Sequence, residues 1–125
     1  MFTSSLYSYT ILVLDSNFFI LLFRYFTQVA EFIGQALTSG QKIFVNCVFG
    51  RSRSTTCVVA YLMLVQGWTL QSSLCHIRRR RPVQLNYGFI RQLVDLENKL
   101  EHIRNNKNSG TNVQVELDQC NNMII

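Results

Sequence analysis

The sequence predicts an α/β fold in which a parallel-sheet core is flanked by helices. A short apolar segment, "KIFV" (42–45), is followed closely by a helix-type segment, and such a strand is typical of a parallel sheet covered on both faces. The predicted elements also follow the order strand, helix, strand, helix, helix, helix, which is the order of a layered α/β protein. In such folds ligands bind where a strand turns into a helix, and the turn after Val45 is the natural place for a ligand.

The first half of the chain supplies two strands and two helices. Residues 9–14 are apolar and β-branched and predict a strand that ends at Asp15. Apolar residues recur at spacings of three and four within 26–37, which predicts an amphipathic helix that Ser39 and Gly40 end. Residues 54–66 are apolar nearly all round and predict a buried helix closed by Gly67.

The second half supplies two more helices and a tail. Thr69 is a good N-cap for a helix that Pro82 stops, and another helix opens near Asn86. The last helix carries one apolar stripe, spaced 4-3-4-3: Phe89, Leu93, Leu96, Leu100 and Ile103. The composition turns polar after Arg104, so we expect a domain over 1–104 and a disordered tail over 105–125.

Composition and charge narrow the class of protein. A chain of 125 residues, 48% hydrophobic and 15% charged, fits one globular domain. The net charge is +5, and the run Arg78–Arg81 is either a solvated helix end, a docking patch for an acidic partner or a nuclear-import signal. Nucleic acid is not expected as a partner, because no aromatic residues interleave with these arginines. No membrane span is expected, because Asp15 interrupts the apolar segment 9–26.

The four cysteines, Cys47, Cys57, Cys75 and Cys120, contain no C-x-x-C pair. We therefore expect reduced thiols in a cytoplasmic or nuclear protein, with no metal site and no cofactor. Cys57 and Cys75 lie in predicted helices and are expected to be in the core or partly buried, and Cys120 is incidental.

The stretch "CVFGRSR" (47–53) forms the predicted turn from strand to helix. A compact loop here aims successive backbone N–H groups at one point, and the following helix adds the positive end of its dipole, so an oxyanion is the expected ligand. Gly50 permits the turn, and the guanidinium of Arg53 can pair with two phosphate oxygens. The expected phosphate-binding residues are Val48, Phe49, Gly50, Arg51, Ser52 and Arg53. For Arg51, a solvent-facing side chain is an equal alternative.

The same surroundings stabilise a thiolate at Cys47, which can attack phosphorus and form a phosphocysteine. Ser54 has two possible roles, which are to cap the helix or to offer its hydroxyl to the sulfur. Asp15 is the acidic residue before Cys47 that lies in a loop, so it is the candidate general acid, with a turn or capping role as the alternative. Glu31 falls on the polar face of a helix and is expected to be solvated.

A family resemblance extends this interpretation. The stretch "CVFGRSRS" resembles the Cys-x5-Arg loop of the cysteine-dependent protein phosphatases, and "SRS" followed by "VVAYLM" resembles the dual-specificity branch. The similarity runs from "YFTQVAEFIGQAL" through "RRRRPVQLNYGFIRQLVDLENKL", about three-quarters of the chain. It implies that Cys47 is the nucleophile, Arg53 the phosphate clamp, Ser54 the leaving-group helper and Asp15 the general acid. It also implies that Asn86 supports the loop.

The sequence departs from the family at three places. Asn46 stands where the family usually has His before the nucleophile, a loop-supporting position that affects the thiolate pKa. The segment "NFFILLF" replaces the polar residues usual after the acid. The family domain normally begins with further strands and a helix that residues 1–8 cannot supply, so we expect part of the N-terminal sheet to be missing.

Three functions follow as competing hypotheses. The first is a metal-independent protein phosphatase that hydrolyses phosphotyrosine and phosphoserine or phosphothreonine. Its partner is a phosphorylated protein, for which a kinase is one candidate. The second is a phosphatase-like module that binds phosphoproteins with little or no turnover. The third is a truncated product without independent function. The sequence does not exclude phosphoinositide or RNA phosphate as substrate, and it does not predict the oligomeric state.

Overall fold

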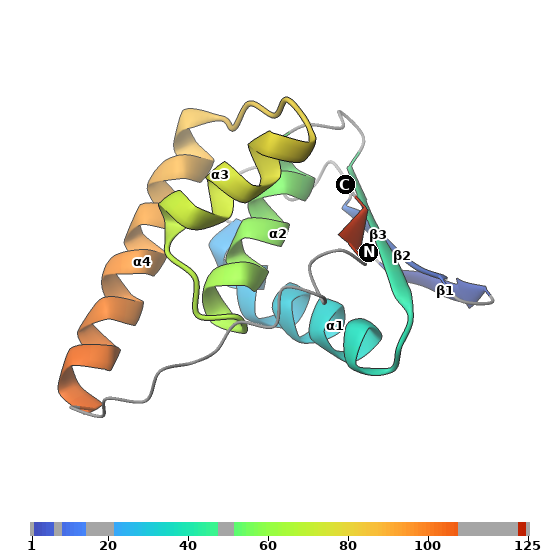
Figure 1. The fold of residues 1–125 in the computed structure, drawn as a ribbon, viewed down its shortest axis with the longest axis horizontal. Coiled ribbons are helices and arrows are strands. Elements are labelled where there is room, and N and C mark those ends of the chain that lie inside the picture. The colour runs from blue at the N-terminus through green and yellow to red at the C-terminus, as the bar shows by residue number, and fades with distance from the viewer. Residues whose placement is uncertain (1, 7–8, 15–21, 48–51, 108–122, 125) are drawn as a thin grey trace.

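The computed structural model describes residues 2–6, 9–14, 22–47, 52–107 and 123–124. A sheet lies on one side of the molecule and a group of helices on the other (Figure 1). This arrangement and the structural neighbours reported below agree with the predicted α/β class. No helix within the described residues is both long and apolar enough to cross a membrane.

The sheet contains four strands in the order β1-β2-β3-β4. They are β1 (Phe2–Leu6), β2 (Tyr9–Leu14), β3 (Lys42–Cys47) and β4 (Met123–Ile124). β3 pairs in parallel with both of its neighbours, and Leu14 at the end of β2 lies opposite Cys47 at the end of β3. β2 has the predicted bounds.

Two strands differ from the sequence-based expectation. Residues 2–6 form β1, which pairs antiparallel with β2, so residues 1–8 supply one strand, contrary to the expectation, while the expectation that part of the N-terminal sheet is missing stays a prediction. Because two residues separate these strands in sequence, an antiparallel hairpin is the geometry open to them. β4 comes from the predicted disordered tail and pairs with Ile43 and Phe44. Residues 105–107 of that tail are helical, and residues 108–122 and 125 lie outside the described residues.

Helix α1 (Phe26–Thr38) follows a short 3-10 helix, η2 (Leu22–Tyr25). Its inner face is the predicted apolar stripe: Phe26, Val29, Ala30, Ile33, Ala36 and Leu37 are all buried. Gly40 ends it with a φ of 74°, a left-handed conformation that glycine adopts without steric cost. This helix covers the sheet and also packs against α2.

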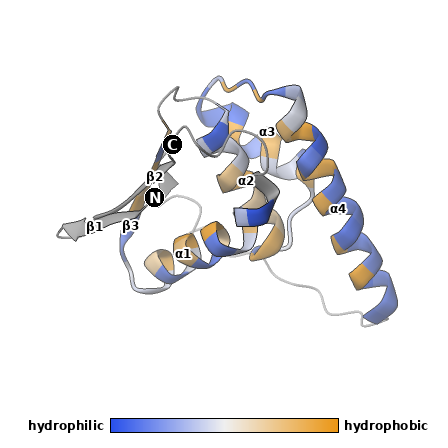
Figure 2. Ribbon diagram, turned by 180° about the vertical axis from the view of Figure 1, so that it is seen from behind, coloured by the Kyte–Doolittle hydropathy of each residue, from blue (hydrophilic) through white to orange (hydrophobic). Residues whose placement is uncertain are grey.

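Helix α2 (Arg53–Leu64) lies at the centre of the helical layer, and every residue from Arg53 to Met63 is buried (Figure 1). Figure 2 shows that most of its length is apolar. Its neighbours are α1, α3 (Leu70–Arg80), α4 (Tyr87–Lys107) and the strand β3. The predicted buried helix is therefore confirmed, and Gly67 beyond its end has a φ of 72°.

The last two helices begin at caps near the expected positions. Thr69 caps α3, and its Oγ1 accepts a hydrogen bond from the Ser72 backbone N–H at 3.1 Å. In α4 the apolar stripe is buried at Phe89 and Leu93, half-buried at Leu96 and Leu100, and 48% exposed at Ile103. The first half of α4 therefore packs on the body, and the helix continues three residues beyond Arg104, the predicted end of the domain.

Candidate active site

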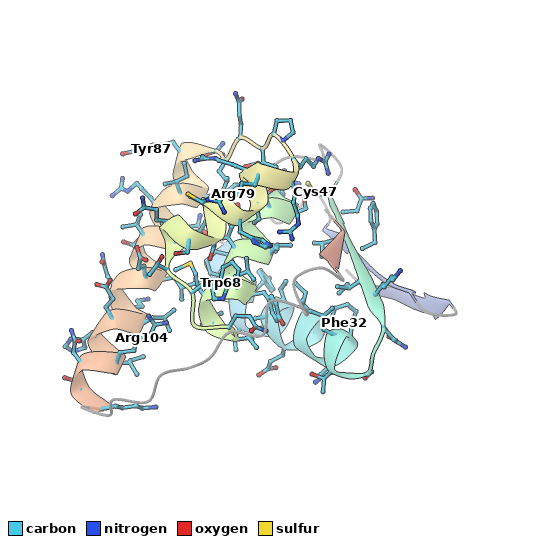
Figure 3. The ribbon with its side chains drawn as sticks, viewed as in Figure 1. Phe32, Cys47, Trp68, Arg79, Tyr87 and Arg104 are labelled. Carbon is cyan, nitrogen blue, oxygen red and sulfur yellow. The ribbon has the colours of Figure 1, made fainter. Side chains whose placement is uncertain are left out.

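Cys47 is the last residue of β3, at the edge of the sheet where α2 begins (Figure 3). Its side chain is 4% exposed and belongs to the core cluster. Side chains alternate between the faces of a strand, so Val45 and Cys47 are buried and Asn46 between them is exposed. The strand therefore turns the Asn46 side chain away from the face that carries the thiol.

Three polar side chains of the first turn of α2 lie at the same junction. Arg53 is 6% exposed, and Ser54 and Thr55 are fully buried. The Cys47 thiol donates a hydrogen bond to Ser54 Oγ, with 3.5 Å between Sγ and Oγ. Of the two predicted roles for Ser54, capping is wrong, because Ser52 is the N-cap residue of α2. The hydroxyl of Ser54 instead faces the sulfur.

Asn86 contacts Ser52, the residue that precedes α2, through its main chain. The backbone N–H of Asn86 donates to Ser52 Oγ at 2.8 Å. The Asn86 side chain serves its own helix, since Oδ1 accepts from the Gly88 backbone N–H at 2.8 Å. Asn86 is the residue that the family resemblance implies as a loop support. Its hydrogen bond to Ser52, however, comes from the backbone amide, which every residue except proline carries.

Cys57 lies one turn beyond Ser54 on α2 and is completely buried, as predicted. Burial raises the pKa of its thiol strongly, and the charge of Cys47 raises it further. Cys57 therefore stays protonated at neutral pH. Cys75 is exposed, so the prediction that it lies in the core or is partly buried is wrong. The buried face of α3 consists of Leu70, Ser73 and Ile77, and position 75 falls outside it.

Several predicted site residues lie outside the described residues. They are Asp15, Val48, Phe49, Gly50 and Arg51. Their roles as general acid and phosphate-binding loop stay predictions. Among the residues that are described, no group of three His, Cys, Asp or Glu side chains is placed to hold a metal ion.

The sequence analysis missed the role of Ser52 as the acceptor that ties the loop to α4. It also missed Glu97, whose Oε1 accepts from the Leu70 backbone N–H at 2.8 Å and so joins α4 to the start of α3. These partners are 34 and 27 residues apart, and no local pattern marks such pairs. A serine two residues before the predicted helix was the available signal for Ser52.

Comparison with known proteins identifies relatives over most of the described chain. The family model "Dual specificity phosphatase, catalytic domain" matches residues 3–99. Dual specificity protein phosphatase 1 of Arabidopsis thaliana is 47% identical over 78 residues, which are 62% of this chain and 39% of that protein. This chain thus spans about two-fifths of the length of that relative.

Two solved human structures show the same fold. DUSP28 is 29% identical with a TM-score of 0.61, and the match covers 63% of this chain and 54% of that chain. The tyrosine phosphatase-like serine/threonine/tyrosine-interacting protein is 32% identical with a TM-score of 0.57, covering 62% of this chain and 52% of that chain.

Proposed function

The chain belongs to the dual-specificity phosphatase catalytic-domain family, and we propose that it hydrolyses phosphotyrosine and phosphoserine or phosphothreonine in proteins through a phosphocysteine. The observation that carries this proposal is the contact between a buried Cys47 Sγ and Ser54 Oγ at the start of α2, beside the buried Arg53. A thiol in that position meets the positive end of a helix dipole, which favours its ionised form.

The proposed reaction has two displacements at phosphorus. The Cys47 thiolate forms the P–S bond while the P–O bond to the substrate side chain breaks, and Asp15 gives its proton to the leaving oxygen. Water then attacks phosphorus, Asp15 takes up a proton from that water, and the P–S bond breaks to release phosphate. When sulfur leaves as thiolate, the Ser54 hydroxyl changes from acceptor to donor and stabilises it. The Arg53 guanidinium holds two phosphate oxygens throughout.

The direct test is hydrolysis of an aryl phosphate by the purified chain, after a cooperative thermal unfolding transition has shown that it is folded. Cys47→Ser should abolish turnover, and EDTA should leave the wild-type rate unchanged. Cys75→Ser is the matched control, because it removes an exposed thiol on α3, and it should retain full activity. Turnover that persists in Cys47→Ser would contradict the proposal, as would a rate that EDTA removes.

A binding module is the second candidate, and Asn46 favours it. This residue occupies the position next to the nucleophile where the family usually has His, and its side chain is exposed. One structural neighbour is described as phosphatase-like and interacting. Phosphopeptide binding that needs Arg53, with no turnover between pH 5 and 8, would select this function over catalysis. A kinase partner and a cytoplasmic or nuclear location stay predictions.

A further inference from the structure

The positive charge of this chain is concentrated in one stretch of its sequence. Between Phe32 and Val94 the sequence contains no Asp or Glu. The same stretch contains eight basic residues: Lys42, Arg51, Arg53, Arg78, Arg79, Arg80, Arg81 and Arg91. The acidic residues of the chain lie before or after this stretch, so β3, α2, α3 and the start of α4 carry positive charge that no carboxylate of their own balances.

The run Arg78–Arg81, which we call the arginine surface, lies at the end of the molecule that holds the site. All four side chains are exposed. Figure 1 shows the C-terminal end of α3, the start of α2, the start of α4 and the end of β3 gathered at one end of the molecule. Cys47 and Arg79 both lie toward that end in Figure 3.

The number of residues between Arg81 and Asn86 sets an upper limit on the distance from the arginine surface to the start of α2. Ser52 is bonded to Asn86, and Arg81 precedes Asn86 by five residues, so the Cα atoms of Arg81 and Asn86 lie within about 18 Å of each other. Arg78 lies about 5 Å further along the axis of α3. An extended peptide advances about 3.3 Å per residue, so about seven residues span the longest of these separations.

We propose that the arginine surface, which lies at the same end of the molecule as Cys47 and the start of α2, selects substrate segments that carry Asp or Glu within about seven residues of the phosphorylated residue. This inference rests on the proposed function of the same site. Acidic side chains complement the positive charge of the arginine surface, and a peptide bound at Cys47 has residues within reach of it. Arginine pairs with carboxylates through two parallel hydrogen bonds, which suits recognition of such side chains.

The four arginines do not contribute equally. Arg80 contacts the imidazole of His76. The backbone N–H of Arg81 bonds the Ile77 carbonyl oxygen at 3.0 Å and so completes the end of α3. Changes at those two positions would disturb the helix as well as the charge. Arg78 and Arg79 are exposed in the last turn of α3, where cations are favourable, so they are the positions to alter.

The experiment compares three substrates with the wild-type chain, Arg78→Ala/Arg79→Ala and a control. The substrates are an aryl phosphate, a phosphotyrosine peptide with three Glu residues within seven positions, and the same peptide with Gln in their place. The control is Lys42→Ala/Lys107→Ala, which removes the same charge. Lys42 begins β3, about 16 Å along the strand from Cys47, and Lys107 ends α4.

The wild-type chain should hydrolyse the Glu peptide with a kcat/KM about tenfold above that of the Gln peptide at low salt, since steering by complementary charge raises association rates by at least this factor. The ratio should fall below about threefold in Arg78→Ala/Arg79→Ala and in 0.5 M salt, because screening shortens the reach of the charges. Hydrolysis of the aryl phosphate should be unchanged in that variant. An unchanged peptide ratio would overturn the proposal, as would an equal loss in the control.

A binding measurement separates this proposal from the proposed function. If the wild-type chain does not hydrolyse the aryl phosphate, the phosphatase proposal fails, and peptide binding to Cys47→Ser by fluorescence anisotropy still tests the arginine surface. Tighter binding of the Glu peptide that requires Arg78 and Arg79 supports the inference. Equal binding of both peptides overturns it. Stronger dependence on these arginines for a single-stranded RNA or for anionic vesicles would also overturn it.

Discussion

Replacing Ser52 by alanine removes the acceptor of the 2.8 Å hydrogen bond from the Asn86 backbone amide. Such a hydrogen bond contributes about 0.5–1.5 kcal/mol to stability. Because Ser52 is half-buried and Asn86 is exposed, water can replace the lost partner, and we expect a value of about 1 kcal/mol or less. If the bond holds the loop in its phosphate-binding conformation, 1 kcal/mol corresponds to about a fivefold change in population. Ser52→Ala should therefore lower kcat/KM for an aryl phosphate two- to fivefold, by about the same factor as the population change.

Asn86→Ala is the comparison variant for Ser52→Ala. It removes the Oδ1 that accepts from the Gly88 N–H at the start of α4, which costs about 1 kcal/mol, but keeps the backbone N–H that bonds Ser52. Both variants should lower the melting temperature by about 4 °C. Only Ser52→Ala should lower kcat/KM. The kcat/KM of Asn86→Ala should stay within about twofold of the wild-type value, because a twofold change corresponds to less free energy than one hydrogen bond contributes. Ser52→Thr restores the hydroxyl and should recover most of the activity.

Kinetics and thermal unfolding on the same samples test both variants. An equal loss of kcat/KM in Asn86→Ala and Ser52→Ala would show that the Asn86 side chain, and not its backbone amide, supports the loop. A Ser52→Ala protein with unchanged melting temperature and unchanged kcat/KM would show that the bond contributes nothing. If the chain proves to bind without turnover, phosphopeptide affinity replaces kcat/KM in the same comparison.

Four further predictions follow from the described contacts. Leu93→Ala removes a fully buried side chain of α4 and should cost about 2–5 kcal/mol in urea unfolding. Iodoacetamide at pH 8 should label Cys75, which is exposed, and leave Cys57 unlabelled in the folded chain, as mass spectrometry of the peptides would show. Burial and the neighbouring arginines lower the pKa of His76, so its NMR titration midpoint should lie below the ordinary value, and its contribution to stability should be lost as the pH falls from 7. Met123→Pro should speed amide exchange in β3, and unchanged exchange would contradict the pairing of β4.

Local patterns predicted the helices well because the information that defines them is local. Every apolar residue expected on the inner face of α1 is buried, since a period of 3.6 residues marks that face directly in the sequence. The two glycines expected to end helices, Gly40 and Gly67, have positive φ. Thr69 caps α3 for a similar reason, because an N-cap bond joins residues only three apart.

Strand pairing was harder to predict because it joins distant segments. β4 contains two residues, separated from β3 by more than seventy positions, and nothing in "MI" marks it as a partner of Ile43 and Phe44. Separation in sequence also explains why no local pattern predicted the hydrogen bond between Asn86 and Ser52. The contact from Asn86 to Ser52 uses a backbone amide, so its donor leaves no trace in the identity of residue 86.

The placement of Arg53 is the clearest physical argument for an anion at this site. A cation at the first position of a helix opposes the dipole, and burial of a charge costs free energy unless it is compensated. Arg53 begins α2 and is 6% exposed, so both effects bear on its guanidinium. An oxyanion seated at the start of α2 would be attracted by the dipole and by the guanidinium together. Orthovanadate, a mimic of phosphate, should therefore raise the melting temperature of the wild-type chain, and Arg53→Met should remove that rise while Arg104→Met keeps it.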